Sequence, residues 1–254
     1  MRYNRVMRKS LLTLLLLLTV GLSATAQQRT VQNRPYADLR RFHFGILVGT
    51  HLQDLELLNV GPQTVTYEDG TTEEVLVTCD QDRWDDGINV GVLGELRLSD
   101  HFQFRIAPAM YFGTRHLTFH NFKEPTEQNP YTERTQALKT AYITCALDLI
   151  FASQRLNNTR PYAMVGVNPM INLSGKDNDF LKLKRSDLYL EAGLGCDFYL
   201  QYFKLRPELK FMYSLTDCLD KNHINNIRDK SMLPYTSSVS EARGKMIVLT
   251  FYFE

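Results

Sequence analysis

Residues 88–98, Ile-Asn-Val-Gly-Val-Leu-Gly-Glu-Leu-Arg-Leu, decide the fold. Apolar side chains recur there at every second position, and the positions between carry Asn89, Glu95 and Arg97. A period of two is typical of a β-strand with one apolar face. After the tight turn Ser99-Asp100-His101, residues 102–112 repeat the pattern with Phe102, Phe104, Ile106, Met110 and Phe112 on one face. The two segments together predict an antiparallel hairpin.

A second hairpin of the same form is expected from residues 188–200 and 203–213, where charged side chains occupy the alternate face. Weaker alternation predicts four more strands, at residues 42–51, 139–151, 162–173 and 245–253. Apolar-out, polar-in strands of about ten residues are the signature of an outer-membrane barrel. The sequence therefore predicts an all-β protein, an eight-stranded antiparallel up-and-down transmembrane β-barrel with long extracellular loops, over residues 42–254.

Residues 1–26 have the features of a secretory signal peptide. Four basic residues precede an apolar run from Leu11 to Leu22, and Ala24-Thr25-Ala26 supplies the small side chains of a cleavage site. We expect residues 1–26 to be removed after Ala26. Residues 27–41, with four arginines, are predicted to be a solvated periplasmic segment; a docking segment for a partner is the alternative.

Connection lengths predict the orientation. Three connections are short, and four are long, near residues 52–87, 120–136, 174–185 and 216–243. With both termini in the periplasm, the long loops face the cell exterior. Asp69-Gly70 in the first loop predicts a turn, and a hairpin there would make ten strands if it crossed the membrane. Its polarity indicates that it stands above the bilayer.

Charge and cysteine content exclude some functions. The expected mature chain carries 25 basic and 28 acidic residues, a net charge of −3, which does not favour nucleic-acid binding. Cys79 and Cys218 fall in predicted loops and could form a disulfide, whereas Cys145 and Cys196 lie on apolar strand faces.

Eight charged residues are predicted to face the lumen. They balance in sign, and an eight-stranded barrel is only wide enough for its own side chains, so we expect a salt-bridged filling more than a conducting pathway. These residues are Glu95, Arg97, Arg105, Glu191, Asp197, Arg206, Glu208 and Lys210.

No enzyme motif is recognised. The six histidines form no pattern with a serine or an acid, so we expect no catalytic residue, cofactor or small-molecule substrate. His116 and His120 could point to one side of a strand as metal ligands would, but no third or fourth ligand can be named, and ordinary polar residues are the favoured interpretation.

Several short segments resemble the PorT family of Bacteroidota. They are residues 33–36, 42–49, 87–91, 96–98, 104–108, 157–162 and 193–195, and the Ala26-Gln27 cleavage context is also usual in that group. Asp148 departs from the pattern, since the resemblance leads us to expect a lysine there. The resemblance implies a non-enzymatic outer-membrane component of the type IX secretion system, acting through contacts with other secretion proteins and with lipid. A small passive channel and a surface adhesin or ligand-binding barrel are the alternatives.

Overall fold

The computed structural model describes residues 31–66, 70–123, 131–175, 179–225, 227 and 232–254. Residues 34–254 form one compact unit, and only this unit is discussed below. The predicted signal peptide, its cleavage site and the Asp69-Gly70 turn's first residue lie outside the described residues. Among the described residues, no helix is long and apolar enough to cross a membrane.

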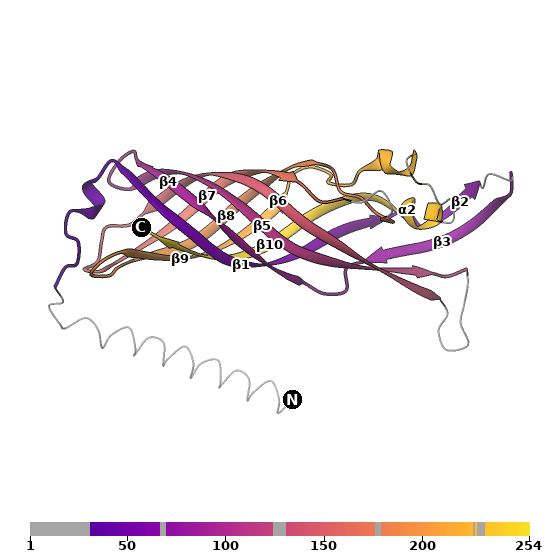
Figure 1. The fold of residues 1–254 in the computed structure, drawn as a ribbon, viewed down its shortest axis with the longest axis horizontal. Helices are drawn as coiled ribbons and strands as arrows, with labels where there is room; N and C mark the ends of the chain where they lie inside the picture. The colour runs from indigo at the N-terminus through magenta and orange to yellow at the C-terminus, as the bar shows by residue number, and fades with distance from the viewer. Residues whose placement is uncertain (1–30, 67–69, 124–130, 176–178, 226, 228–231) are drawn as a thin grey trace, which may run out of the picture. The chain divides into compact units, whose positions relative to one another are not determined.

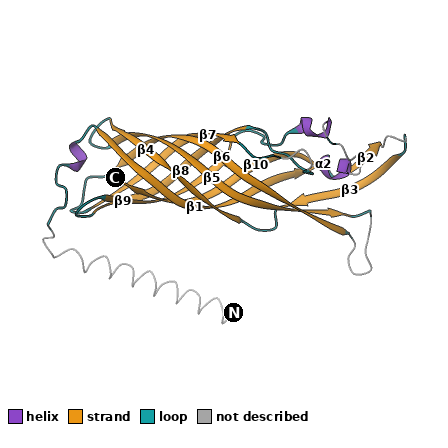
Figure 2. Cartoon of the chain, viewed as in Figure 1, coloured by secondary structure: helices purple, strands orange, loops and turns teal. Residues whose placement is uncertain are grey.

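The described chain forms ten strands, and eight of them close a ring (Figures 1 and 2). The order around the ring is β5-β4-β1-β10-β9-β8-β7-β6, and β6 pairs with β5 from Phe102↔Phe151 to Asn121↔Thr132 to close it. All ladders are antiparallel, as predicted. The ring strands are β1 (Phe42–Asn59), β4 (Asp85–Arg97), β5 (Phe102–Asn121), β6 (Thr132–Ala152), β7 (Thr159–Asn172), β8 (Ser186–Tyr199), β9 (Lys204–Ser214) and β10 (Val239–Phe253).

The other two strands form a hairpin outside the ring. Strand β2 (Pro62–Thr66) pairs with β3 (Thr72–Asp80), and β3 continues alongside β5 where Asp80 is opposite Thr118. The prediction of eight ring strands with a separate first-loop hairpin is confirmed. Figure 1 shows this hairpin beyond one end of the barrel, which we call the loop end; the opposite end, with the short connections at residues 98–101, 153–158 and 200–203, is the turn end.

Several strands are longer than the alternation predicted, mostly toward the loop end; β7 instead begins at Thr159 and not at residue 162, which extends it toward the turn end. Strand β1 continues to Asn59 and β5 to Asn121, while β6 begins at Thr132. Inward side chains of these extensions, such as Leu117 and Phe119, pack in a hydrophobic cluster with Tyr235 of the short helix α2 (Leu233–Thr236). Two 3-10 turns, η1 (Ala37–Leu39) and η2 (Lys221–Asn225), complete the described elements.

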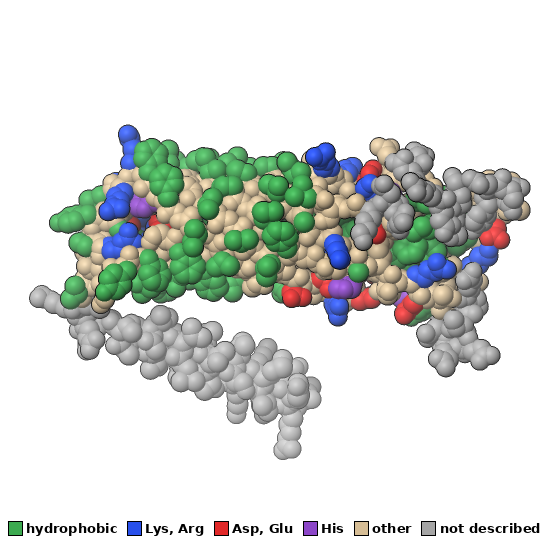
Figure 3. Space-filling view, in the orientation of Figure 1, with side chains coloured by type: hydrophobic (Ala, Val, Ile, Leu, Met, Phe, Trp, Pro, Cys, Tyr) green, Lys and Arg blue, Asp and Glu red, His purple; other side chains and the backbone are tan. Residues whose placement is uncertain are grey.

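An apolar belt covers the outer wall toward the turn end, and charged side chains begin beyond it (Figure 3). It arises because outward positions on every ring strand carry aliphatic or aromatic residues, while their neighbours in sequence are buried. An apolar band around a closed barrel is typical of a lipid-facing wall. Its most exposed members include Phe44, Ile46, Ile88, Val92, Ile106, Leu149, Val165, Leu194, Leu209 and Phe211.

Candidate functional site

A network of ion pairs fills the lumen in its turn-end half. Arg105 Nη1 lies 2.8 Å from Glu208 Oε2, and Arg206 Nη1 lies 2.5 Å from Glu95 Oε2. Arg206 Nε also donates to Asp197 Oδ1 at 2.5 Å. The side chains of these five residues are 0–1% exposed. Solvent therefore does not reach the network, and each charge is compensated by opposite charges within hydrogen-bond distance.

Aromatic side chains hold the network in place. The hydroxyl groups of Tyr162 and Tyr252 donate to Glu208 at 2.7 and 2.8 Å, and the Arg105 guanidinium carbon lies 4.3 Å from the centre of the Tyr252 ring. The Tyr162 ring needs Gly195 beside it, because a Cβ there would meet the phenolic oxygen at 2.3 Å. These contacts fix the guanidinium and carboxylate groups in one arrangement.

Seven of the eight residues predicted for the lumen are buried inside the barrel. Glu191 and Lys210 form a separate pair at 3.1 Å nearer the loop end, and Asn168 Nδ2 donates to Glu191 at 3.2 Å. Arg97 is the exception. Its side chain is a quarter exposed and pairs with Asp100 of the adjoining turn, because Arg97 is the last residue of β4 and lies at the rim.

Three further charged residues join the network. Asp148 Oδ2 lies 3.7 Å from Arg105 Nη1, and the carboxylate of Glu254, the last residue, pairs with Lys204 and lies 3.4 Å from Arg206 Nη1. Asp148 and Lys204 occupy inward positions of their strands, so the alternation could have identified both as lumen residues. Glu254 has the same inward parity, but it follows the end of β10 and was not among the residues predicted for the lumen.

The segment before the barrel was expected to be solvated. It is exposed at Tyr36 and Leu39, but Arg34 and Asp38 hold it against the barrel. Arg34 Nη1 donates to the Glu254 carbonyl oxygen at 3.0 Å. Asp38 lies 3.6 Å from Arg155 Nη1 and from Arg160 Nη1, and it accepts a hydrogen bond from the Tyr199 hydroxyl. Local alternation stops at residue 42, so it could not show that Asp38 neutralises two arginines of the turn end.

The disulfide that Cys79 and Cys218 could have formed is not present, and both are free thiols. Both belong to the hydrophobic cluster at the loop end instead of exposed loops, and Cys218 Sγ donates to the Ala242 carbonyl oxygen at 3.1 Å. Cys79 lies on an inward position of β3, a strand that the sequence did not separate from the loop. Burial raises the pKa of the Cys218 thiol to about 12 and raises that of Cys79 further.

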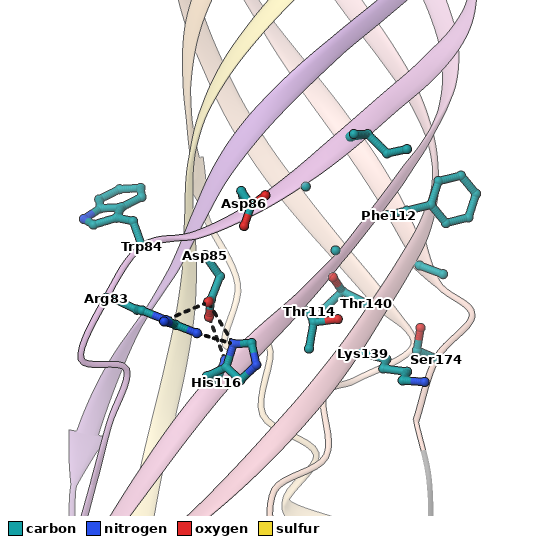
Figure 4. Close-up of a pocket in the computed structure, with 14 residues that line it drawn as sticks. Arg83, Trp84, Asp85, Asp86, Phe112, Thr114, His116, Lys139, Thr140 and Ser174 are labelled. Carbon is teal, nitrogen blue, oxygen red and sulfur yellow. Dashed lines mark hydrogen bonds and ion pairs between the residues drawn. The ribbon is translucent and has the colours of Figure 1, made fainter.

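A groove of about 860 Å³ lies on the outer wall where the apolar belt ends. Figure 4 shows its lining from the start of β4, from β5 and from β6. Asp85 closes the break between β3 and β4: its carboxylate accepts from the His116 backbone N–H at 2.6 Å and lies 2.8 Å from His116 Nδ1 and 3.4 Å from Arg83 Nε. No sequence pattern pointed to this groove.

His116 and His120 do lie on one face of β5, the outer one, and each is near a carboxylate. His116 contacts Asp85, and His120 Nε2 is 3.3 Å from Glu133 Oε1. In the described part of the chain, no group of three or more His, Cys, Asp or Glu side chains could hold a metal ion.

A sequence-family match agrees with the closed ring, the apolar belt and the filled lumen. Residues 25–220 match the family of the outer membrane protein β-barrel domain. The chain belongs to this family. Family membership places the protein among the β-barrels of the bacterial outer membrane and its belt in contact with lipid. No curated protein matches the chain.

Three solved structures show a distant similarity to this chain, and the first of them is an outer membrane protein. OprG from Pseudomonas aeruginosa is 14% identical, with 88% of this chain and 95% of that chain covered and a TM-score of 0.44. Neisserial surface protein A is 10% identical, with 84% and 98% covered and a TM-score of 0.39. Ail of Yersinia pestis, solved in complex with the heparin analogue sucrose octasulfate, is 12% identical, with 84% and 99% covered and a TM-score of 0.34.

Proposed function

We propose that this family member is a non-enzymatic component of the type IX secretion system, which acts through contacts of its surfaces with other secretion proteins. The observation that carries the proposal is the closed lumen: Arg105 and Arg206 are fully buried among carboxylates, so the barrel interior offers no path for a cargo protein. The reason for naming the type IX system in particular is the resemblance of the sequence to the PorT family.

Residues at the turn end are suited to such contacts. The segment at residues 34–39 is anchored to the barrel by Asp38, yet Tyr36 and Leu39 are 74% and 62% exposed. An anchored segment presents these side chains in a fixed arrangement, which lowers the entropy that a partner must remove on binding. If the termini are periplasmic, as the connection lengths predict, this surface faces the periplasm.

Deletion of the gene followed by measurement of cargo export tests the proposal. We expect cargo with a type IX signal to remain inside the cell, and normal export would refute the assignment. Complementation then tests the mode of action. A Tyr36→Asp variant should restore export less than the wild type does, whereas Glu74→Gln, an exposed change on the β2–β3 hairpin, should restore it fully. Heat-modifiability on a gel verifies that both variants fold and insert.

A passive channel is the alternative that the filled lumen disfavours most directly. Planar-bilayer recordings of the purified protein should show no conductance steps. Reproducible conductance steps of the wild-type protein would favour the channel over the secretion role. The adhesin or ligand-binding alternative draws on the long first and last loops. It predicts that trimming residues 53–86 abolishes binding to a host or partner surface while the barrel still inserts.

A further inference from the structure

The groove at the loop-end edge of the apolar belt has an amphipathic lining. Ile88 and Phe112, the last large apolar side chains of the belt on β4 and β5, form one part, and both are exposed on the outer wall. The other part is polar and includes Asp86, Thr114, Lys139 and Ser174. A groove that changes from apolar to charged at the edge of a lipid-facing surface matches a molecule with the same gradient, namely a membrane amphiphile.

The strand register places two opposite charges in one row across the wall. Thr114 of β5 is opposite Lys139 of β6, and Asp86 immediately precedes Gly87, which is opposite Gly113. Asp86, Thr114 and Lys139 thus lie on three neighbouring strands, with Asp86 and Lys139 separated by about two strand spacings, roughly 10 Å. Figure 4 shows Lys139 and Ser174 on one side of the groove and Asp86 on the other.

These two charges are not neutralised by the protein. Asp86 and Lys139 are exposed, and within the described residues neither forms an ion pair or a side-chain hydrogen bond. The other charges of the groove do pair, because the Asp85 carboxylate lies between His116 and Arg83. What remains for a ligand is one ammonium group and one carboxylate on opposite sides, with the Thr114 and Ser174 hydroxyls beside Lys139.

We propose that this groove binds a membrane amphiphile whose headgroup carries a phosphate and a primary ammonium, that is, a phosphoethanolamine headgroup. The phosphate accepts hydrogen bonds from Lys139 and the neighbouring hydroxyls, and the ammonium donates to Asp86. The acyl chains lie along Ile88 and Phe112 on the belt. An anionic headgroup without an ammonium would face Asp86 with like charge, so the groove selects the zwitterion. This inference does not depend on the proposed role in secretion.

Trp84 makes the groove directly observable. It is the only tryptophan of the chain, it lines the groove, and it is partly exposed. Its fluorescence in the purified, detergent-solubilised protein therefore reports on this site alone. The probe is dihexanoyl phosphatidylethanolamine, compared with phosphatidylglycerol of the same chain length and with phosphoethanolamine that has no acyl chains.

We expect a saturable change in Trp84 emission that needs less phosphatidylethanolamine than phosphatidylglycerol, and little change with the chain-free headgroup. Asp86→Asn should remove the preference between the two lipids. Lys139→Gln should weaken both about two- to fivefold, the range of an exposed ion pair. The matched control Glu74→Gln removes an exposed carboxylate outside the groove and should leave both titrations unchanged.

Three results would overturn the proposal: equal binding of the two lipids by the wild type, a preference that survives Asp86→Asn, or binding of the chain-free headgroup as tight as that of the lipid, which would indicate a soluble ligand. A second measurement uses bilayers of lipids brominated near the acyl carbonyl. Trp84 must be quenched in them, and unquenched emission would place the groove away from the membrane boundary and refute the site.

Discussion

Arg105 on β5 and Glu208 on β9 are 2.8 Å apart, although three strands separate β5 from β9 in either direction around the ring. The pair therefore spans the lumen from one wall to the opposite wall. The Arg206–Glu95 pair, from β9 to β4, crosses the lumen beside it. Cross-lumen pairs join walls that share no backbone hydrogen bonds, so they close the barrel interior and brace the ring against deformation.

Removal of one partner of this pair should be severely destabilising. In Arg105→Met, Glu208 would remain buried without its ion-pair partner, whereas Glu95 keeps Arg206; the expected cost is about 3–5 kcal/mol. Urea unfolding of the refolded protein, followed by tyrosine and tryptophan emission, measures the loss. The double variant Arg105→Met, Glu208→Met should lose less than the single variant. A loss below about 1 kcal/mol in Arg105→Met, within the range of an exposed pair, would contradict a dry network.

The Asp85 carboxylate is expected to protect one amide. It accepts a hydrogen bond from the His116 N–H on the edge of β5 that neither β3 nor β4 covers, while β6 pairs with the opposite edge. Asp85→Asn weakens a charge-assisted bond worth about 1.5–3 kcal/mol, so hydrogen exchange at the His116 amide should accelerate about tenfold or more. Asp86→Asn, one residue away and exposed, is the control and should leave that amide unchanged.

Breaking the turn-end anchor should expose the chain to protease. Asp38 is the common partner of Arg155, Arg160 and Tyr199, and Asp38→Asn removes its charge. We expect faster trypsin cleavage after Arg40 and Arg41 in the folded, membrane-embedded protein. Asp100→Asn, which removes the exposed partner of Arg97, is the matched control. Equal cleavage of the two variants would show that Asp38 does not hold the segment.

The two loop-end thiols should be unreactive in the folded protein. Burial raises the pKa of Cys218 to about 12, and that of Cys79 is raised more, so both stay protonated at pH 8. We expect iodoacetamide to modify them only after unfolding, and gel migration to be the same with and without reductant. Modification of the folded protein at these two positions, or a reductant-dependent shift, would refute this.

The raised pKa of Cys218 also predicts that the free energy of unfolding depends on pH. A thiol whose pKa is higher in the folded state contributes stability that is fully present below its ordinary pKa near 9. The contribution of Cys218 is lost as the pH rises from there through about 12. A Cys218→Ser variant should therefore show a smaller fall in unfolding free energy between pH 9 and 11 than the wild type does. An identical fall in both would count against the buried-thiol explanation.

Period-two alternation by itself determined the fold class, the number of ring strands and which side chains face inward. Residues 88–98 already specify one lipid-facing and one lumen-facing side, because successive side chains of a strand point to opposite faces. The eight predicted strands and their antiparallel order follow from this local rule and from the lengths of the connections. The same rule placed seven of the eight predicted lumen charges inside the barrel.

Only the tertiary structure decided which of those charges meet and where the strands end. Alternation says that Arg105 and Glu208 point inward, but their contact depends on the register of eight ladders and on closure between β5 and β6. Distant residues therefore come together without a local signal, as Glu254 does with Lys204, and Asp38 with Arg155. Cys79 and Cys218 are buried for the same reason: the strand extensions and α2 form a hydrophobic cluster at the loop end, and its members are far apart in the sequence.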